Sequence, residues 1–238
     1  MTKNLLRGIT LLILFLTGYI ANAQTERKWE DIGTDIYSKR TIKKDGLKLV
    51  LIDKDTLFSK ATEQNMINVF FKVYPQEEKR FYPKALHTIT IVITKEYDGV
   101  AATLGGIIKV NPGWLKKHPE DYDLLTHELM HVVQAYGNHD VPFWLREGIA
   151  DYVRFKYGVN NEKAGWSLPS YQAGQSYTNA YRVTARFLVW LEINKRADIV
   201  DQLNTAMRTG TYTADTWTAL TEKTVDQLWA EYSSNPSI

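Results

Sequence analysis

The order of hydrophobic and polar residues changes character midway along the chain. Four segments of the first half carry regular patterns: residues 47–52, 86–94 and 100–110 have the alternation or β-branched content of strands, and residues 61–82 have helical spacing. The helix is expected to end before Pro83, and the glycine pair Gly105-Gly106 interrupts the last strand. Residues 24–45 are polar and predict an extended lead-in or a short edge element.

The second half of the chain predicts helices. They are expected over residues 119–136, 142–155, 178–195, 197–208 and 224–233. Pro119 suits a first helical turn, Asp140 suits a cap of the second helix, and Gly158 suits its stop. Residues 162–176 are rich in Gly, Ser, Pro and Tyr and predict a loop. Strands followed by helices predict an α+β domain, with a small mixed sheet packed on one helix and a mainly helical C-terminal half.

The N-terminus has the pattern of an export signal. Two basic residues precede the uncharged apolar run Ile9–Tyr19, and Ala21-Asn22-Ala23 supplies the small residues of a cleavage site. The run is shorter than the roughly 20 apolar residues that span a bilayer. We therefore expect residues 1–23 to be a signal peptide cleaved near Ala23, and residues 24–238 to form one exported domain, secreted or periplasmic.

Charge and composition limit the partners of the mature chain. The sequence has 29 Lys and Arg against 27 Asp and Glu, and the leader carries two of the basic residues. The mature chain is thus near neutral, which gives no reason to expect nucleic acid or an anionic membrane as a partner. No later segment is apolar enough to span a membrane. The sequence has no cysteine, so the exported fold must depend on its own core, for which a hydrophobic content of 44% is sufficient.

A candidate metal site lies in the segment His127-Glu128-Leu129-Met130-His131. Two histidines four residues apart lie on one face of a helix, where their imidazoles can take neighbouring corners of a tetrahedral zinc. Glu128 lies about a quarter-turn away and suits a general base for a zinc-activated water. The apolar residues cluster on the opposite face: Leu125, Leu129, Val132 and Tyr136.

The third metal ligand has three candidates downstream. Glu147 is preferred, and Asp151 follows it by one helical turn, where it suits a hydrogen-bond partner of a ligand histidine. Asp151 itself and His139, which lies among turn-forming residues, remain alternatives as ligands. Gly148 beside the preferred glutamate would allow another helix to approach closely.

Three segments resemble a known family of zinc peptidases. Residues 126–134 (Thr-His-Glu-Leu-Met-His-Val-Val-Gln), 147–153 (Glu-Gly-Ile-Ala-Asp-Tyr-Val) and 181–188 (Tyr-Arg-Val-Thr-Ala-Arg-Phe-Leu) resemble the plant and bacterial basic secretory proteins. These are zincin-type peptidases similar to the glutamate-zincin group that includes thermolysin. The resemblance runs from about residue 86 to the C-terminus and is most specific over residues 126–153.

The resemblance implies a zincin-like fold, one Zn²⁺ and hydrolysis of peptide bonds. It implies His127 and His131 as zinc ligands, Glu128 as the catalytic base, and a Glu147–Asp151 pair like that of thermolysin, where an aspartate orients a ligand histidine. It also implies that the strand at residues 100–110 borders the cleft and binds extended peptide. The chain departs from the pattern in two ways: His131 and Glu147 are closer in sequence than in thermolysin-like enzymes, and the mature chain is not basic.

The predicted function is a secreted zinc metallopeptidase, an endopeptidase that takes peptide or protein substrates. Tyr181 is the candidate donor to the oxyanion, with Tyr177 as the alternative. A second hypothesis is a catalytically inert zincin-like module that binds surface polymers or peptides. A third is another zinc hydrolase, such as an amidase acting on cell-wall peptides.

Overall fold

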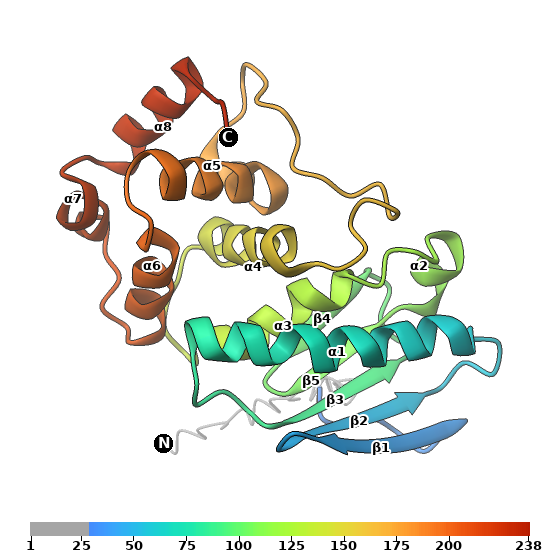
Figure 1. Ribbon diagram of the computed structural model, residues 1–238. Helices are drawn as coiled ribbons and strands as arrows, with labels where there is room; N and C mark the ends of the chain where they lie inside the picture. The colour runs from blue at the N-terminus through green and yellow to red at the C-terminus, as the bar shows by residue number, and fades with distance from the viewer. Residues whose placement is uncertain (1–28) are drawn as a thin grey trace, which may run out of the picture. The chain divides into compact units, whose positions relative to one another are not determined.

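A computed structural model describes residues 29–238 of the chain (Figure 1). The predicted signal peptide, residues 1–23, lies outside the described residues. Residues 32–238 pack as one unit. Its strands are β1 (Ser38–Lys44), β2 (Leu47–Asp53), β3 (Thr88–Ile93), β4 (Ala101–Leu104) and β5 (Ile107–Val110). Its helices are α1 (Lys60–Phe81), α2 (Pro112–Lys117), α3 (Leu124–Gln134), α4 (Phe143–Tyr157), the 3₁₀ turn η1 (Tyr177–Asn179), α5 (Tyr181–Asn194), α6 (Ile199–Arg208), α7 (Asp215–Thr221) and α8 (Val225–Ser234).

The five strands form one mixed sheet in the order β1-β2-β3-β5-β4. The central pairs β2–β3 and β3–β5 are parallel, and both outer pairs are antiparallel. Ile91, Val92 and Ile93 of β3 are all fully buried, as expected for a central parallel strand covered on both faces. A mixed sheet followed by helices confirms the α+β prediction.

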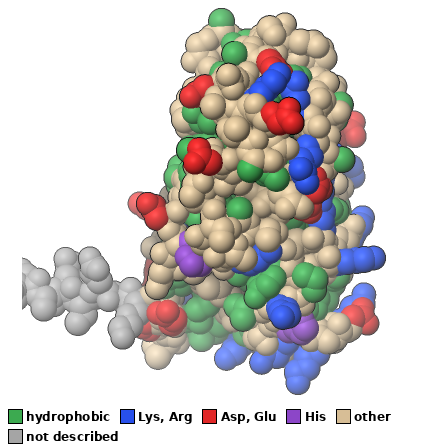
Figure 2. Space-filling view, turned by 90° about the vertical axis from the view of Figure 1, so that its left-hand side faces the viewer, with side chains coloured by type: hydrophobic (Ala, Val, Ile, Leu, Met, Phe, Trp, Pro, Cys, Tyr) green, Lys and Arg blue, Asp and Glu red, His purple; other side chains and the backbone are tan. Residues whose placement is uncertain are grey.

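The two outer strands differ sharply in charge. β1 has the sequence Ser-Lys-Arg-Thr-Ile-Lys-Lys, and its basic side chains are exposed. Figure 2 shows Lys and Arg side chains gathered at the lower end of this unit, where the strands lie in Figure 1. Charged side chains discourage an edge strand from pairing with another chain. β4, with the sequence Ala-Ala-Thr-Leu, has no charged residue.

Residues 100–110 were expected to form one strand, and that prediction is wrong. The structure has two strands there, β4 and β5, which pair as a hairpin with Thr103 opposite Ile108. Gly105 has a φ of +58°, a left-handed conformation that glycine adopts at little cost. The glycine pair therefore reverses the chain, and β4 becomes the edge of the sheet.

The helix expected over residues 119–136 is also shorter than predicted. α2 ends at Lys117 and α3 begins only at Leu124. Between them, Asp121 accepts a hydrogen bond from Trp114 Nε1 at 2.7 Å and pairs with the buried Arg154. Asp123 accepts from the backbone N–H of Asn160. These contacts to distant residues hold the segment in turns, so Pro119 does not open the helix.

The remaining helices follow the predicted pattern with local shifts. α1 packs against α3, and its side chains Met66, Phe70 and Val73 are fully buried. α4 begins after Pro142, so Asp140 is not its cap, whereas Gly158 follows its end as expected. The sequence patterns did not predict α7, which holds the fully buried Trp217. Among the helices of residues 29–238, none combines the length and apolar character needed to cross a bilayer.

Helices α4 and α5 pack extensively against each other. A Cβ added at Gly148 would lie 2.3 Å from Thr184 Cγ2, which is too close for any side chain. The glycine thus lets α5 approach α4 directly beside Glu147. This close packing fixes the position of the helix that carries the candidate third ligand.

Candidate metal centre

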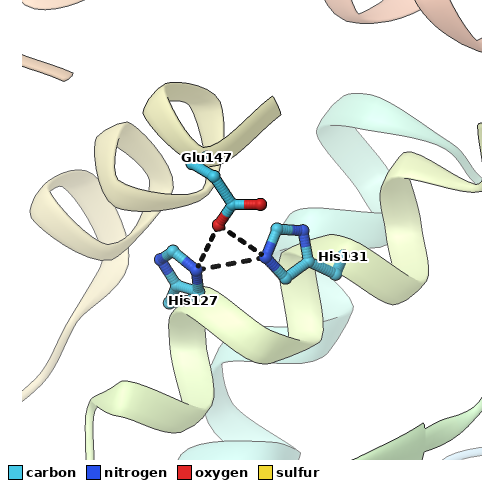
Figure 3. A group of neighbouring side chains, drawn as sticks. All are labelled: His127, His131 and Glu147. Atoms are coloured by element: carbon cyan, nitrogen blue, oxygen red, sulfur yellow. Dashed lines mark hydrogen bonds and ion pairs between the residues drawn. The ribbon is translucent and has the colours of Figure 1, made fainter. Parts of the chain in front are cut away.

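Three side chains from two helices converge at one point (Figure 3). α3 places His127 and His131 on one face, and α4 brings Glu147 over them. The two Nε2 atoms lie 3.1 Å apart, and Glu147 Oε2 lies 3.3 Å from each of them. The structure therefore brings together both predicted histidines and the preferred third candidate. Within residues 29–238, this trio is the group of side chains whose geometry can hold a metal ion.

Hydrogen bonds behind the two histidines fix which ring nitrogen faces the centre. His127 Nδ1 lies 2.7 Å from Asp151 Oδ1, and His131 Nδ1 lies 2.7 Å from Gln134 Oε1. The amide of Gln134 is oriented in turn, because its Nε2 donates to the carbonyl of Arg146 at 2.8 Å. Both rings thus carry hydrogen on Nδ1, and both direct an Nε2 lone pair toward the centre.

The donor set fits a small divalent cation. Two imidazole lone pairs and a carboxylate oxygen would repel one another unless a cation lay between them. In a tetrahedral zinc site with bonds of about 2.0–2.1 Å, neighbouring ligand atoms lie about 3.3 Å apart. The observed separations of 3.1, 3.3 and 3.3 Å match that spacing. Three protein ligands leave a fourth position for water or substrate.

The charges around the trio also favour a cation. Burial would lower the pKa of His127, but Asp151 and Glu147 outweigh it and raise that pKa to about 10. Burial would likewise raise the pKa of Glu147, yet the two histidines hold it well below its usual range. Glu147 Oε1 is bound by Arg146 Nε at 2.9 Å, which leaves Oε2 for the centre. The site thus attracts positive charge, whether a proton or a metal ion.

Glu128 lies beside the trio and is held by a residue of the sheet. It is 6% exposed and lines the same cleft as the histidines. Its Oε2 accepts a hydrogen bond from Thr103 Oγ1 at 2.7 Å.

Sequence reasoning identified neither Thr103 nor Gln134 as a partner of the site. Gln134 lies three residues from His131 on the same helix, so helical spacing was a signal for it, whereas Thr103 is 25 residues from its partner and only the fold joins them.

A cleft of about 1480 Å³ opens over the site. β4 forms one side of it, α3 its floor, and the start of α4 with Tyr181 another side. Five of the exposed large hydrophobic residues of the described chain line this cleft: Leu86, Val100, Leu104, Phe143 and Tyr181. Exposed apolar side chains gathered in a groove are typical of a ligand-binding surface.

Tyr181 reaches the centre from a strained turn. Its ring stacks on the ring of His127 with centroids 6.2 Å apart and planes at 19°. Ala180 has φ 62° and ψ −174°, a region almost confined to glycine, and Tyr181 has a φ of 50°. Thr184 Oγ1 fastens this turn by donating to the carbonyl of Tyr177 at 2.6 Å. Backbone strain of this kind is typical of functional sites.

Of the three alternatives weighed from the sequence, Asp151 binds His127 Nδ1 from behind, whereas Tyr177 and His139 lie elsewhere. The hydroxyl of Tyr177 donates to Asp226 at 2.8 Å, and Tyr177 does not line the cleft. The ring of His139 lies against Gly210 and is not part of the metal-binding trio. The structure thus separates both residues from the centre.

Among the solved structures that are similar to this chain are two peptidases. The first is a mutant of a two-domain M1 zinc metallopeptidase bound to L-tryptophan, with 15% identity, a TM-score of 0.43, and coverage of 84% of this chain and 49% of that one. The second is an aminopeptidase N family protein from Idiomarina loihiensis, with 13% identity, a TM-score of 0.41, and coverage of 84% and 41%. The chain therefore spans about half the length of these proteins or less.

The family comparison extends over most of the sequence. No curated protein matches the chain. Residues 48–232 match the family described as a peptidase of plants and bacteria, a span that holds His127, Glu128, His131 and Glu147 and begins well before the region of resemblance found from motifs. The chain belongs to this family of plant and bacterial peptidases.

Proposed function

We propose that this protein is an exported zinc-dependent endopeptidase. The observation that carries the proposal is the convergence of His127 Nε2, His131 Nε2 and Glu147 Oε2 at the separations of a tetrahedral zinc site. Membership in a peptidase family supports the same conclusion. Export is supported by the signal-like N-terminal sequence.

The residues around the centre have complementary tasks. Zinc bound here would supply an acidified water and polarise the scissile carbonyl. Glu128 accepts a proton from the attacking water on its free Oε1 and transfers it to the nitrogen of the leaving amine. Tyr181 donates its phenolic hydrogen to the developing oxyanion, a role its place over His127 supports. Asp151 and Gln134 hold the two imidazoles in the metal-binding tautomer.

The substrate lies in the cleft as an extended strand beside β4. The other edge of the sheet is covered with basic side chains, whereas β4 is uncharged and borders Glu128. An unprotected edge strand is a liability in a folded protein unless another strand is meant to pair with it. The uncharged edge therefore supports peptide binding by strand addition.

Cleavage within a chain fits the cleft better than removal of an N-terminal residue. An aminopeptidase needs a carboxylate to bind the α-ammonium group of its substrate. Among the described residues that line the cleft, each of the four carboxylates already has a partner or a task in the proposed reaction. Asp121 binds Arg154, Asp151 binds His127, Glu147 belongs to the metal-binding trio, and Glu128 accepts from Thr103.

Glu128 also distinguishes the enzyme from an inert binding module. A module that only binds peptides or surface polymers would not require a carboxylate beside the metal, held by a hydrogen bond of its own. An amidase on cell-wall peptides would use the same centre. Profiling against unstructured proteins and cell-wall peptides in parallel separates that reaction class from protein cleavage.

The proposed function is tested by metal analysis and proteolysis of the purified mature chain. We expect about one equivalent of zinc and cleavage of an unstructured protein such as casein. Glu128→Gln should keep the zinc and lose at least about 100-fold in kcat, the contribution of a general base. Glu162→Gln, in the exposed loop, is the matched control and should keep both. Less than about half an equivalent of zinc, together with no cleavage, would refute the proposal.

A further inference from the structure

Within residues 29–238, Thr103 is the residue whose side chain hydrogen-bonds to the catalytic carboxylate, and it does so from the sheet. Its Oγ1 lies 2.7 Å from Glu128 Oε2 and 3.1 Å from the backbone carbonyl oxygen of the same residue. A hydroxyl has one hydrogen to donate. The carboxylate oxygen Oε2 is the main acceptor, because it is the nearer of the two oxygens and carries charge. Oε2 is thereby occupied, and Oε1 is the oxygen left to accept a proton from water.

The backbone N–H and C=O of Thr103 lie in the plane of the sheet and point toward its open edge. In an antiparallel pair, opposed residues alternate between hydrogen-bonded and non-hydrogen-bonded pairs. Asn111 N donates to Val100 O at 3.0 Å, which makes Val100–Asn111 a hydrogen-bonded pair. Ala102 and Leu104 are then bonded to β5, and Thr103 lies in a non-hydrogen-bonded pair with Ile108. Its N–H and C=O therefore point away from β5, to the side where a substrate strand would add.

We propose that Thr103 is a positioning residue that couples the bound substrate to the catalytic base, holding Glu128 through its hydroxyl while its backbone hydrogen-bonds to the peptide. This proposal rests on the proposed function. Among the residues of β4, Thr103 alone can both hold Glu128 with its side chain and offer its backbone to a substrate strand. Ala102 and Leu104 direct their backbone groups to β5 instead, and the side chain of Ala101 has no hydrogen-bond donor.

The arrangement has a mechanical consequence. A glutamate side chain has three rotatable bonds, and a misplacement of about 1 Å can cost on the order of 100-fold in rate. A strand that pairs with β4 orders Thr103, and the hydroxyl then orders Glu128 against the same peptide. Substrate binding thus aligns the base with the bond to be cleaved.

The test compares Thr103→Val, which has the same shape without the donor, with Thr103→Ser, which keeps it. Thr103→Val should bind one equivalent of zinc as the wild type does, with kcat lowered about 10- to 100-fold and KM changed less than about twofold. Thr103→Ser should recover kcat to within about threefold of wild type. Thr90→Val on β3 is the matched control for the loss of a strand hydroxyl and should leave both constants unchanged.

Two further measurements separate positioning from a structural role. In a Glu128→Gln background, Thr103→Val should cause no further loss of the residual rate, because the hydroxyl acts through that carboxylate. A crystal structure of zinc-loaded Thr103→Val should show the Glu128 side chain in a different rotamer.

The proposal is overturned if Thr103→Val keeps full kcat, if it slows both backgrounds equally, or if Glu128 does not move. A wild-type protein that binds zinc but cleaves nothing would refute the proposed function, whereas the crystal structure would still decide the Thr103 contact.

Discussion

Replacing Asp151 by asparagine should weaken zinc binding without disturbing the fold. Asp151 is 5% exposed, and its Oδ1 lies 2.7 Å from His127 Nδ1, so the bond is buried and charge-assisted. Hydrogen bonds to charged groups contribute about 1.5–3 kcal/mol and neutral ones about 0.5–1.5 kcal/mol. Asparagine keeps the shape of the side chain but replaces the charged hydrogen bond by a neutral one. The difference between the two kinds of bond is about 1–1.5 kcal/mol, which corresponds to about a tenfold loss of zinc affinity.

The assay is competition for zinc with a chromophoric chelator at one fixed pH and ionic strength. Melting in excess zinc, followed by circular dichroism, checks that the variant is folded. Asp140→Asn is the matched control, because this residue is exposed outside the metal centre, and it should leave zinc affinity unchanged. An Asp151→Asn variant with the zinc affinity of wild type would show that this hydrogen bond does not hold His127 in its metal-binding tautomer.

Three further predictions concern neighbouring parts of the structure. Glu147→Ala should lose zinc and His139→Ala should retain it in metal analysis; the opposite result would reassign the third ligand. Gly148→Ala should lower the free energy of unfolding in urea by about 1–3 kcal/mol, because its Cβ would lie 2.3 Å from Thr184 Cγ2; an unchanged midpoint would refute the close packing of α4 and α5. Burial raises the pKa of Glu77 well above its ordinary 4.5, so the folded state keeps a proton that the unfolded state releases, and stability should fall as pH rises above about 4.5. Glu77→Gln should remove part of that decline in unfolding experiments across pH, and an identical decline in both proteins would contradict the burial argument.

The part of the site that is local in sequence could be predicted from spacing. His127, Glu128 and His131 lie within one and a half helical turns, so their relative placement follows from helix geometry alone. The third metal ligand could not be chosen without knowing how α4 packs on α3. The sequence therefore left three candidates for it: Glu147, Asp151 and His139. The packing brings Glu147 to the histidine pair and sets Asp151 behind His127.

The late start of α3 has a physical cause that the sequence pattern does not report. Periodicity reports which face of an element is apolar, but it does not report contacts between distant polar side chains. Asp121 and Asp123 bind Arg154 and the backbone of Asn160, and these bonds keep residues 118–123 out of the helix. The contact of Thr103 with Glu128 is of the same kind. Contacts between residues far apart in the sequence thus decide both where α3 begins and how Glu128 is held.

The strained turn before α5 links the stability of the fold to the proposed role of Tyr181. Ala180 occupies a backbone region that costs a non-glycine residue about 1–3 kcal/mol, so glycine at this position would stabilise the folded chain. Glycine would also free the turn that aims Tyr181 at the centre. A library selected only for thermal survival should therefore accumulate Ala180→Gly, and a library selected for turnover should reject it. Engineering this enzyme for hot conditions would have to find its stability elsewhere in the molecule.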